Sequence, residues 1–115
     1  MLKIYGIKNC DTMKKAMAEL DQLGEAYEFH DYKKEGIDAT TLGVWVAALG
    51  LDAVLNRRGT SWRKLSPEQQ AQAGTEAGAI ALMQENTSLI KRPILQGEGL
   101  LQCGFKSGDY VEQLT

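Results

Sequence analysis

A single cysteine placed between a short strand and a helix is the feature that most constrains this chain. Residues 2–7 are rich in strand-forming side chains. From there onward the apolar residues recur at helical spacing, at Met13, Ala16, Met17, Leu20 and Leu23. Cys10 therefore falls in the turn that leads into the helix, where backbone N–H groups and the helix dipole stabilise a thiolate. On local sequence alone, an activated thiol and a small buried side chain remain two interpretations of Cys10.

The composition sets limits on size and partners. The chain has 115 residues, which suffices for one domain with a hydrophobic core. Its net charge of −2 lacks the basic excess of a general nucleic-acid-binding protein. No apolar run approaches the length of a membrane span, and Lys3 and Lys8 interrupt the first apolar run, unlike a signal peptide. We therefore expect a cytoplasmic protein without a membrane partner or a direct nucleic-acid partner.

The two cysteines, Cys10 and Cys103, lie near opposite ends of the chain. A structural disulfide between them is not expected in a reducing compartment, and the sequence leaves open whether they approach each other. Position 13 is Met, so Cys10 has no C-x-x-C partner. One histidine and two distant cysteines do not form a metal-ligand pattern, so neither a metal site nor a bound cofactor is expected.

The middle of the chain predicts a helical region after a second strand. Alternation of aromatic and polar residues predicts a strand at 27–32, followed by a charged loop at 33–36. Asp38 caps a predicted helix at 39–49, and a short helical piece follows at 51–55. A capping-box pattern at 66–69 starts two short helices that separate near Gly74 and end near Glu85. The face of the second of these is assigned to Ala77, Ile80, Ala81 and Gln84.

The remaining pattern completes a fold. Residues 89–95 lead into a third strand, a hairpin turn is predicted at 97–99, and a fourth strand at 100–103 includes Cys103. A last helix opens at Ser107 or Asp109. Strand, helix and strand form a parallel βαβ unit, to which the hairpin adds an antiparallel pair. We predict one α/β domain over 1–115, with a thioredoxin-type four-stranded mixed sheet and a helical insertion, about 38–88, between the second and third strands.

The segment from Asn56 to Lys64 is the most basic part of the chain. It contains Arg57, Arg58, Arg63 and Lys64 together with Gly59, Thr60 and Ser61. One interpretation is an exposed charged loop. The other is an anion-binding loop from which an arginine reaches a site elsewhere in the molecule.

Four segments carry a resemblance to a known family. They are residues 5–12 (YGIKNCDT), Arg57-Arg58-Gly59 followed by Trp62-Arg63-Lys64-Leu65, Lys91-Arg92-Pro93-Ile94, and Gly104-Phe105-Lys106. In this order and spacing they resemble the arsenate-reductase-like family, which also contains the Spx regulators, and most closely its small YffB-type members. The resemblance covers nearly the whole chain.

The resemblance implies roles for several residues. Cys10 corresponds to the family's nucleophile, and Arg92 to the arginine that binds the substrate anion or stabilises the thiolate. The corresponding proline of thioredoxin-like folds is cis, which implies a cis Arg92–Pro93 bond. A second arginine of the family corresponds loosely to Arg58 or Arg57. The resemblance also implies that Thr12 caps the helix or faces Cys10, and that Lys14 replaces an arginine that arsenate reductases often have.

Two departures from the family bear on function. Arsenate reductases of this class have a third arginine near the end of the chain, where this sequence has Phe105 followed by Lys106. Spx regulators carry a C-x-x-C redox switch. In this sequence, Met13 stands at the position of the second cysteine of that switch. The chain therefore lacks one arginine that arsenate reductases of this class use, and it lacks the second cysteine that a C-x-x-C switch needs.

Three functions are compatible with this sequence. The first is a thiol reductase in which Cys10 forms a mixed disulfide that an external thiol, glutathione, resolves. In this case Arg92 and Arg57 or Arg58 bind the carboxylates of glutathione, which serves as a cosubstrate. The second is an Spx-like regulator that binds the α subunit of RNA polymerase. The third is an arsenate reductase.

Overall fold

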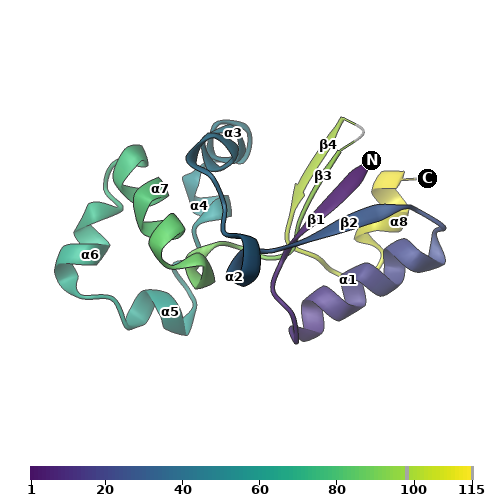
Figure 1. Ribbon diagram of the computed structural model, residues 1–115, viewed down its shortest axis with the longest axis horizontal. Helices are drawn as coiled ribbons and strands as arrows, with labels where there is room; N and C mark the ends of the chain where they lie inside the picture. Colours follow the sequence, from purple (N-terminus) through teal and green to yellow (C-terminus); the bar gives the residue numbers. More distant parts are fainter. Residues whose placement is uncertain (98, 115) are drawn as a thin grey trace. The chain divides into compact units, whose positions relative to one another are not determined.

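The computed structural model describes residues 1–97 and 99–114, and its contacts divide the chain into two compact units. Unit 1 comprises Met1–Glu35 and Arg92–Thr115, and unit 2 comprises Gly36–Lys91. Figure 1 shows the elements in chain order. The elements of unit 1 are β1 (Leu2–Gly6), α1 (Asp11–Gln22), β2 (Tyr27–Asp31), α2 (Tyr32–Glu35), β3 (Ile94–Gly97), β4 (Leu100–Cys103) and α8 (Asp109–Leu114).

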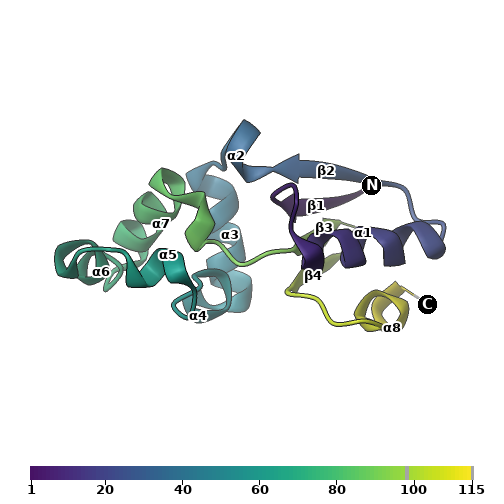
Figure 2. The same cartoon turned by 90° about the horizontal axis from the view of Figure 1, so that it is seen from below.

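Unit 1 is built on a four-stranded mixed sheet in the order β2-β1-β3-β4. β1 and β2 are parallel, with Ile4 opposite Phe29, whereas β3 is antiparallel to both β1 and β4. The helices α1 and α8 lie on the same side of this sheet (Figure 2). The predicted mixed sheet is confirmed. Of the predicted hairpin turn, Glu98 lies outside the described residues.

The core of unit 1 lies between the sheet and these two helices. From α1, Met13, Ala16 and Leu20 are fully buried, as their helical spacing predicted. They pack against Leu2, Ile4, Leu95 and Tyr110. Burial of a side chain the size of leucine contributes about 1.5–3 kcal/mol to folding. This packing fixes α1 against β1, and therefore fixes the turn between them that carries Cys10.

A buried carboxylate joins α1 to the start of α8. Glu19 is only 9% exposed, and its carboxylate accepts hydrogen bonds from the backbone N–H groups of Gly108 (2.7 Å), Tyr110 (2.9 Å) and Val111 (3.3 Å). The first N–H groups of a helix have no partner within the helix, and a negative charge near them also interacts favourably with the helix dipole. Glu19 thus caps α8 from another helix.

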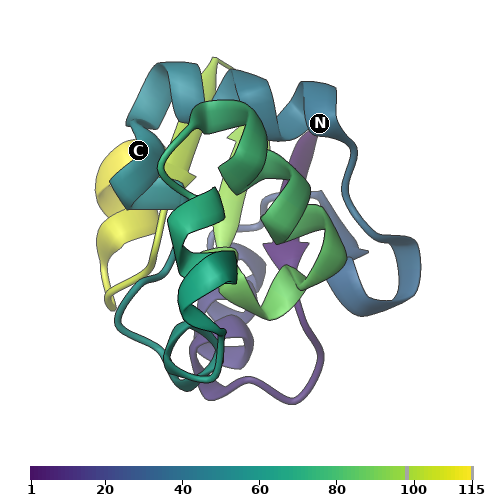
Figure 3. The same ribbon diagram turned by 90° about the vertical axis from the view of Figure 1, so that its left-hand side faces the viewer.

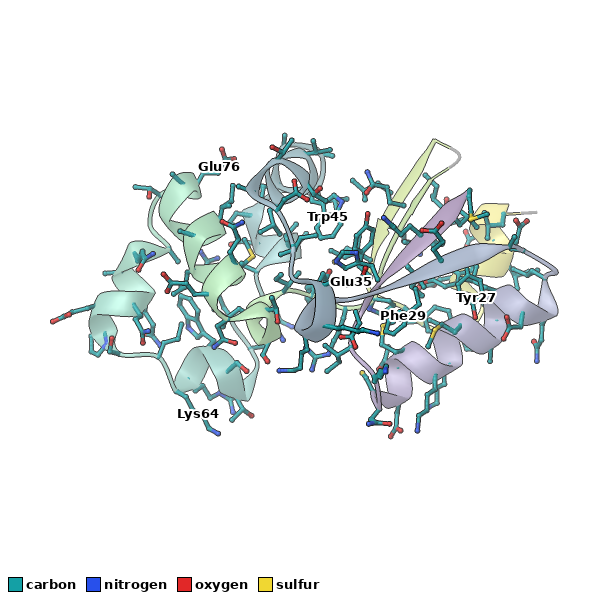
Figure 4. The ribbon with its side chains drawn as sticks, viewed as in Figure 1. Tyr27, Phe29, Glu35, Trp45, Lys64 and Glu76 are labelled. Atoms are coloured by element: carbon teal, nitrogen blue, oxygen red, sulfur yellow. The ribbon has the colours of Figure 1, made fainter. Side chains whose placement is uncertain are left out.

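Unit 2 is helical, and its helices face the viewer in Figure 3. Its elements are α3 (Ala39–Leu49), α4 (Leu51–Val54), α5 (Thr60–Arg63), α6 (Pro67–Gln72), α7 (Glu76–Glu85) and the 3-10 helix η1 (Thr87–Leu89). Trp45 of α3 is fully buried, and its side chain is drawn in Figure 4. The predicted caps are confirmed, since Asp38 accepts from the Thr41 N–H and Ser66 forms a complete capping box with Gln69.

Some local predictions were wrong. Residues 32–35 form the short helix α2 rather than the end of a strand and a loop. The buried face of α7 consists of Ala79, Leu82 and Met83, whereas Ala77 and Gln84 are exposed. α7 is apolar over most of its circumference, so its sequence does not define a single face. The predicted third strand is present as β3 from Ile94, and in the residues leading into it, 87–89 form η1 and Ile90 makes an isolated bridge with Leu55.

Within the described residues, no helix is long and apolar enough to cross a membrane. The prediction that the whole chain is a single domain stays a prediction.

We expect Glu19→Gln to destabilise the protein by about 1–3 kcal/mol, because the hydrogen bonds to the start of α8 lose their charge. Urea unfolding followed by circular dichroism measures this loss. Glu85→Gln, which removes an exposed carboxylate from α7, is the matched control and should change the free energy of unfolding by less than about 0.5 kcal/mol. Equal effects of the two substitutions would contradict a capping role for Glu19.

Candidate active site

The turn between β1 and α1 places Cys10 at the start of the helix. Asn9 has a φ of 59°, a left-handed conformation that asparagine adopts more readily than most residues. Cys10 follows in an extended conformation (φ −106°, ψ 125°) and is the N-cap of α1. Its carbonyl oxygen accepts a hydrogen bond from the Lys14 N–H at 3.0 Å, the first bond of the helix. The predicted location of Cys10 is confirmed.

The surroundings of the Cys10 thiol favour its ionised form. Partial burial alone raises its pKa, because the thiolate loses solvation. The backbone N–H of Met13, the guanidinium group of Arg92 and the backbone N–H of Thr12 together outweigh this effect, and the pKa lies below the usual value. The Cys10 side chain accepts no N-cap hydrogen bond from the first N–H groups of α1. The site therefore offers a thiolate close to free helix N–H groups and a permanent positive charge.

Arg92 lies immediately before a buried proline, which directly precedes β3. The Arg92–Pro93 peptide bond is cis, as the family resemblance implied. Pro93 is buried, and its carbonyl oxygen accepts a hydrogen bond from the Gly104 N–H at 2.8 Å. The Nε–H of Arg92 is buried and has no hydrogen-bond partner among the described residues. The guanidinium group thus retains a donor in addition to those that face the thiol.

Gly6 and Met13 form the packing contact beneath this turn. A Cβ atom at Gly6 would lie 2.2 Å from the Met13 sulfur, so a side chain at this position would displace Met13. Met13 is fully buried, and its backbone N–H is one of the groups that lower the Cys10 pKa. The glycine therefore allows the first turn of α1 to approach the end of β1.

Cys103 faces away from α1. It pairs with Ile94, which in turn pairs with Tyr5. Residues paired across strands share a face, whereas successive residues along a strand alternate. Ile4 packs against α1, so Tyr5, Ile94 and Cys103 share the opposite face of the sheet. Neither cysteine is in a disulfide, and Cys103 lies on the sheet face that α1 does not cover.

The other predicted site residues differ in how the structure places them. Thr12 lies beside Cys10 and acts through its backbone N–H, but it does not cap the helix, since Cys10 occupies the cap position. Lys14 is exposed and is not among the groups that shift the Cys10 pKa. Arg57 and Arg58 belong to unit 2, and their role toward Cys10 stays a prediction.

Within unit 2, Arg57 and Arg58 have different surroundings. Arg57 forms an ion pair with Asp52, and its guanidinium carbon lies 5.6 Å from the centroid of the Trp62 ring. The Arg58 guanidinium makes no hydrogen bond or ion pair with any described residue, although the Arg58 N–H donates to Asn56 Oδ1 at 3.1 Å. Of the two, Arg58 has the side chain that is available to a ligand.

The position of the third family arginine is filled by an aromatic contact. The Phe105 ring lies 4.8 Å from the Tyr110 ring, measured between centroids, and packs against the core of unit 1.

The described residues contain no group of three or more metal-ligating side chains arranged to hold a metal ion. A hollow of about 210 Å³ next to Phe105 is lined by Lys15, Ala18, Glu19, Gln22, Phe105 and Ser107.

Two contributions to the site were not predicted from the sequence. Met13 was predicted as an apolar residue of the helix and as the residue that replaces a second cysteine, but its backbone N–H also acts on the thiol. The signal that could have indicated this is its position three residues after Cys10, because N-cap side chains accept bonds from that residue's N–H. The contact between Gly6 and Met13 has no comparable signal, since it depends on how α1 packs.

Comparison with known proteins places this geometry in a family. A model of the ArsC family matches residues 5–113. The solved structure of the YffB protein is 49% identical, covers 100% of each chain and superposes with a TM-score of 0.93. An arsenate reductase (ArsC) related protein from Brucella melitensis is 46% identical over 96% of this chain and 92% of its own, with a TM-score of 0.74. An uncharacterised protein of Haemophilus influenzae is 38% identical over 96% of both chains. The thioredoxin-like fold is confirmed.

We expect Arg92→Gln to raise the pKa of Cys10, because burial continues to disfavour the thiolate while the guanidinium group no longer opposes it. A rise of one unit lowers the thiolate fraction, and with it the alkylation rate at neutral pH, about tenfold. The measurement is the pH dependence of iodoacetamide alkylation on a Cys103→Ser background.

Lys15→Gln removes one exposed positive charge from α1 and is the matched control for this experiment. Its alkylation profile should coincide with that of the parent protein. If Arg92→Gln also left the profile unchanged, Arg92 would not stabilise the thiolate.

Proposed function

Because this chain belongs to the ArsC family, we propose that it is a thiol-dependent reductase in which Cys10 is the nucleophile and glutathione the electron donor. The observation that carries the proposal is the lowered pKa of Cys10, at the N-terminus of α1 and beside Arg92. A thiolate is the reactive form of cysteine, and a permanent cation beside it can also hold an anionic substrate.

The chemistry needs one protein thiol. The Cys10 thiolate attacks the glutathione sulfur of a mixed disulfide RS–SG, the S–S bond breaks, and RS⁻ leaves and takes up a proton. A glutathione thiolate then attacks the glutathione sulfur bound to Cys10, which releases glutathione disulfide and restores the Cys10 thiolate. The net reaction reduces RS–SG by one glutathione to RSH and glutathione disulfide.

The absence of a second protein thiol at the site supports resolution by an external thiol. Position 13 is occupied by a buried methionine, and Cys103 lies on the sheet face opposite α1. Position 13 therefore offers no thiol, and the thiol of Cys103 belongs to the other face of the sheet. The mixed disulfide on Cys10 is therefore left for a second glutathione, the role proposed for this cosubstrate.

The anionic groups of glutathione require cations. Arg92 is a partly exposed, permanently charged guanidinium beside Cys10, which suits it to a carboxylate next to the thiol. In unit 2, we assign the second carboxylate to Arg58 rather than Arg57, because Arg57 already pairs with Asp52.

Arsenate reduction is a second candidate, favoured by the arsenate reductase (ArsC) related protein to which this chain is 46% identical. Against it, Phe105 stands where that class has a third arginine, and its ring packs on Tyr110. Because the site has one anion ligand fewer than arsenate reductases of this class, we favour a mixed disulfide over arsenate as the substrate. Binding to the RNA polymerase α subunit is a further hypothesis that a pull-down experiment tests.

We expect Cys10→Ser to abolish glutathione-dependent reduction of a small mixed disulfide, with a loss of at least about 100-fold, because the nucleophile is removed. Oxidation of NADPH by added glutathione reductase follows the reaction. Cys103→Ser is the matched control and should retain the activity of the parent protein.

Intact-mass measurement after incubation with glutathione disulfide should show one bound glutathione, which Cys10→Ser eliminates. The proposal would be wrong if Cys10→Ser kept its activity, or if the parent protein oxidised glutathione only when arsenate was present.

A further inference from the structure

One segment of unit 2 carries Arg57, Arg58, Arg63 and Lys64 and is here called the basic loop (residues 57–64), although its residues Thr60–Arg63 form the short helix α5 rather than the loop expected from the sequence. Its charge is opposite to that of the protein. The protein has a net charge of −2, and unit 2 contains five basic and five acidic residues. Four of those five basic residues lie within these eight positions. All four are exposed, so their charge faces solvent rather than an enclosed site.

Little of this charge is neutralised within unit 2. Asp52 pairs with Arg57. Neither the Arg58 guanidinium nor the Lys64 ammonium has a hydrogen bond or ion pair among the described residues, and Lys64 points away from the helices of unit 2 (Figure 4). Charges that serve only solubility are usually interspersed with charges of the opposite sign. Here, the positive charges are gathered on one segment.

The backbone that carries these side chains is held by a set of local contacts. The Asn56 N–H donates to the Leu89 carbonyl oxygen at 2.7 Å, and the Arg58 N–H donates to Asn56 Oδ1. The Arg63 Nη2 donates to the Arg58 carbonyl oxygen at 3.1 Å, which links the start of the segment to the end of α5 within it. An ordered backbone reduces the entropy that a ligand must overcome when it binds.

The loop also has an aromatic component. Arg57 lies over the ring of the half-buried Trp62, and the Trp62 carbonyl oxygen accepts a hydrogen bond from the Gln70 side chain at 3.0 Å. Arginine and tryptophan are the residue types that contribute most to protein interfaces. Their combination on a fixed segment is more typical of a binding surface than of a solvated connection.

We propose that the basic loop is a docking surface for an acidic segment of a partner protein. Exposed arginines on a fixed backbone suit carboxylates, which they bind in bidentate fashion. A nucleic acid fits less well, because four cations on a protein of net negative charge do not provide an extended basic track. The proposal does not depend on the reductase chemistry of Cys10.

The test is a titration of ¹⁵N-labelled protein with a short Glu-rich peptide at low salt, followed through the indole N–H signals. The Trp62 signal should shift with the peptide, and the shift should diminish with added salt. Trp45 is fully buried in α3, so its signal is an internal control. A neutral peptide of the same length should leave both signals unchanged.

The variant Arg63→Gln/Lys64→Gln should bind the peptide at least about fivefold more weakly, because two of the four cations are removed. Lys33→Gln/Lys34→Gln removes two adjacent exposed lysines of α2 and should bind like the parent protein. Circular dichroism melting curves establish that each variant is folded.

Three results would overturn the proposal: no shift of the Trp62 signal, equal weakening in both double variants, or tighter binding of a single-stranded oligonucleotide than of the peptide at the same salt. Reductase activity measured on the same samples separates the two proposals. If Arg63→Gln/Lys64→Gln loses peptide binding but keeps reductase activity, the docking proposal is supported independently of the reaction. If the parent protein binds the peptide but has no reductase activity, only the proposed reaction is contradicted.

Discussion

The attraction between the Cys10 thiolate and the groups around it is the interaction on which the site depends. A thiolate that is partly withdrawn from water is unfavourable unless nearby donors or positive charges replace its hydration. Here the donors are the first N–H groups of α1, and the positive charge is Arg92. The N–H groups belong to a helix backbone, and the Arg92 guanidinium is partly buried, with its Nε inaccessible to solvent.

The rest of unit 1 keeps these groups together. β1 and β3 are adjacent strands, so the turn after β1 and the residues before β3 meet at the same end of the sheet. Fully buried side chains of α1 fix the helix on the sheet, and the contact between Gly6 and Met13 sets how closely its first turn approaches β1. Two turns further along α1, Glu19 holds the start of α8. A single helix thereby links the reactive thiol to the packing of the C-terminal segment.

The sequence predicted the sheet, its mixed topology and most helix boundaries, because these depend on local signals. The caps at Asp38 and Ser66 and the spacing of Met13, Ala16 and Leu20 are examples. The buried face of α7 was predicted wrongly, because small apolar residues occupy most of the circumference of this helix. The helix at 32–35 was missed because Lys33, Lys34 and Glu35 are as common in charged loops as in short helices.

For the site, the position of Cys10 followed from local pattern, whereas Arg92 and the cis Arg92–Pro93 bond were expected only from the family resemblance. An arginine at the start of a strand is most often exposed, so nothing local distinguishes Arg92. The difference between Arg57 and Arg58 could not be predicted either, because it depends on which side chain meets Asp52 and Trp62 after folding. The backbone N–H of Met13 contributes whatever its side chain, which is why residue identity did not reveal it.

The central claim is that the fold itself activates Cys10, and an ultraviolet titration of the thiolate near 240 nm tests it most directly. The measurement uses Cys103→Ser protein, so that Cys10 is the only thiol, with Cys10→Ser/Cys103→Ser as the blank. We predict a single transition with a midpoint clearly below the value of about 8.5 for a free cysteine. A midpoint at or above that value would contradict the account, because burial would then outweigh the helix N–H groups and Arg92.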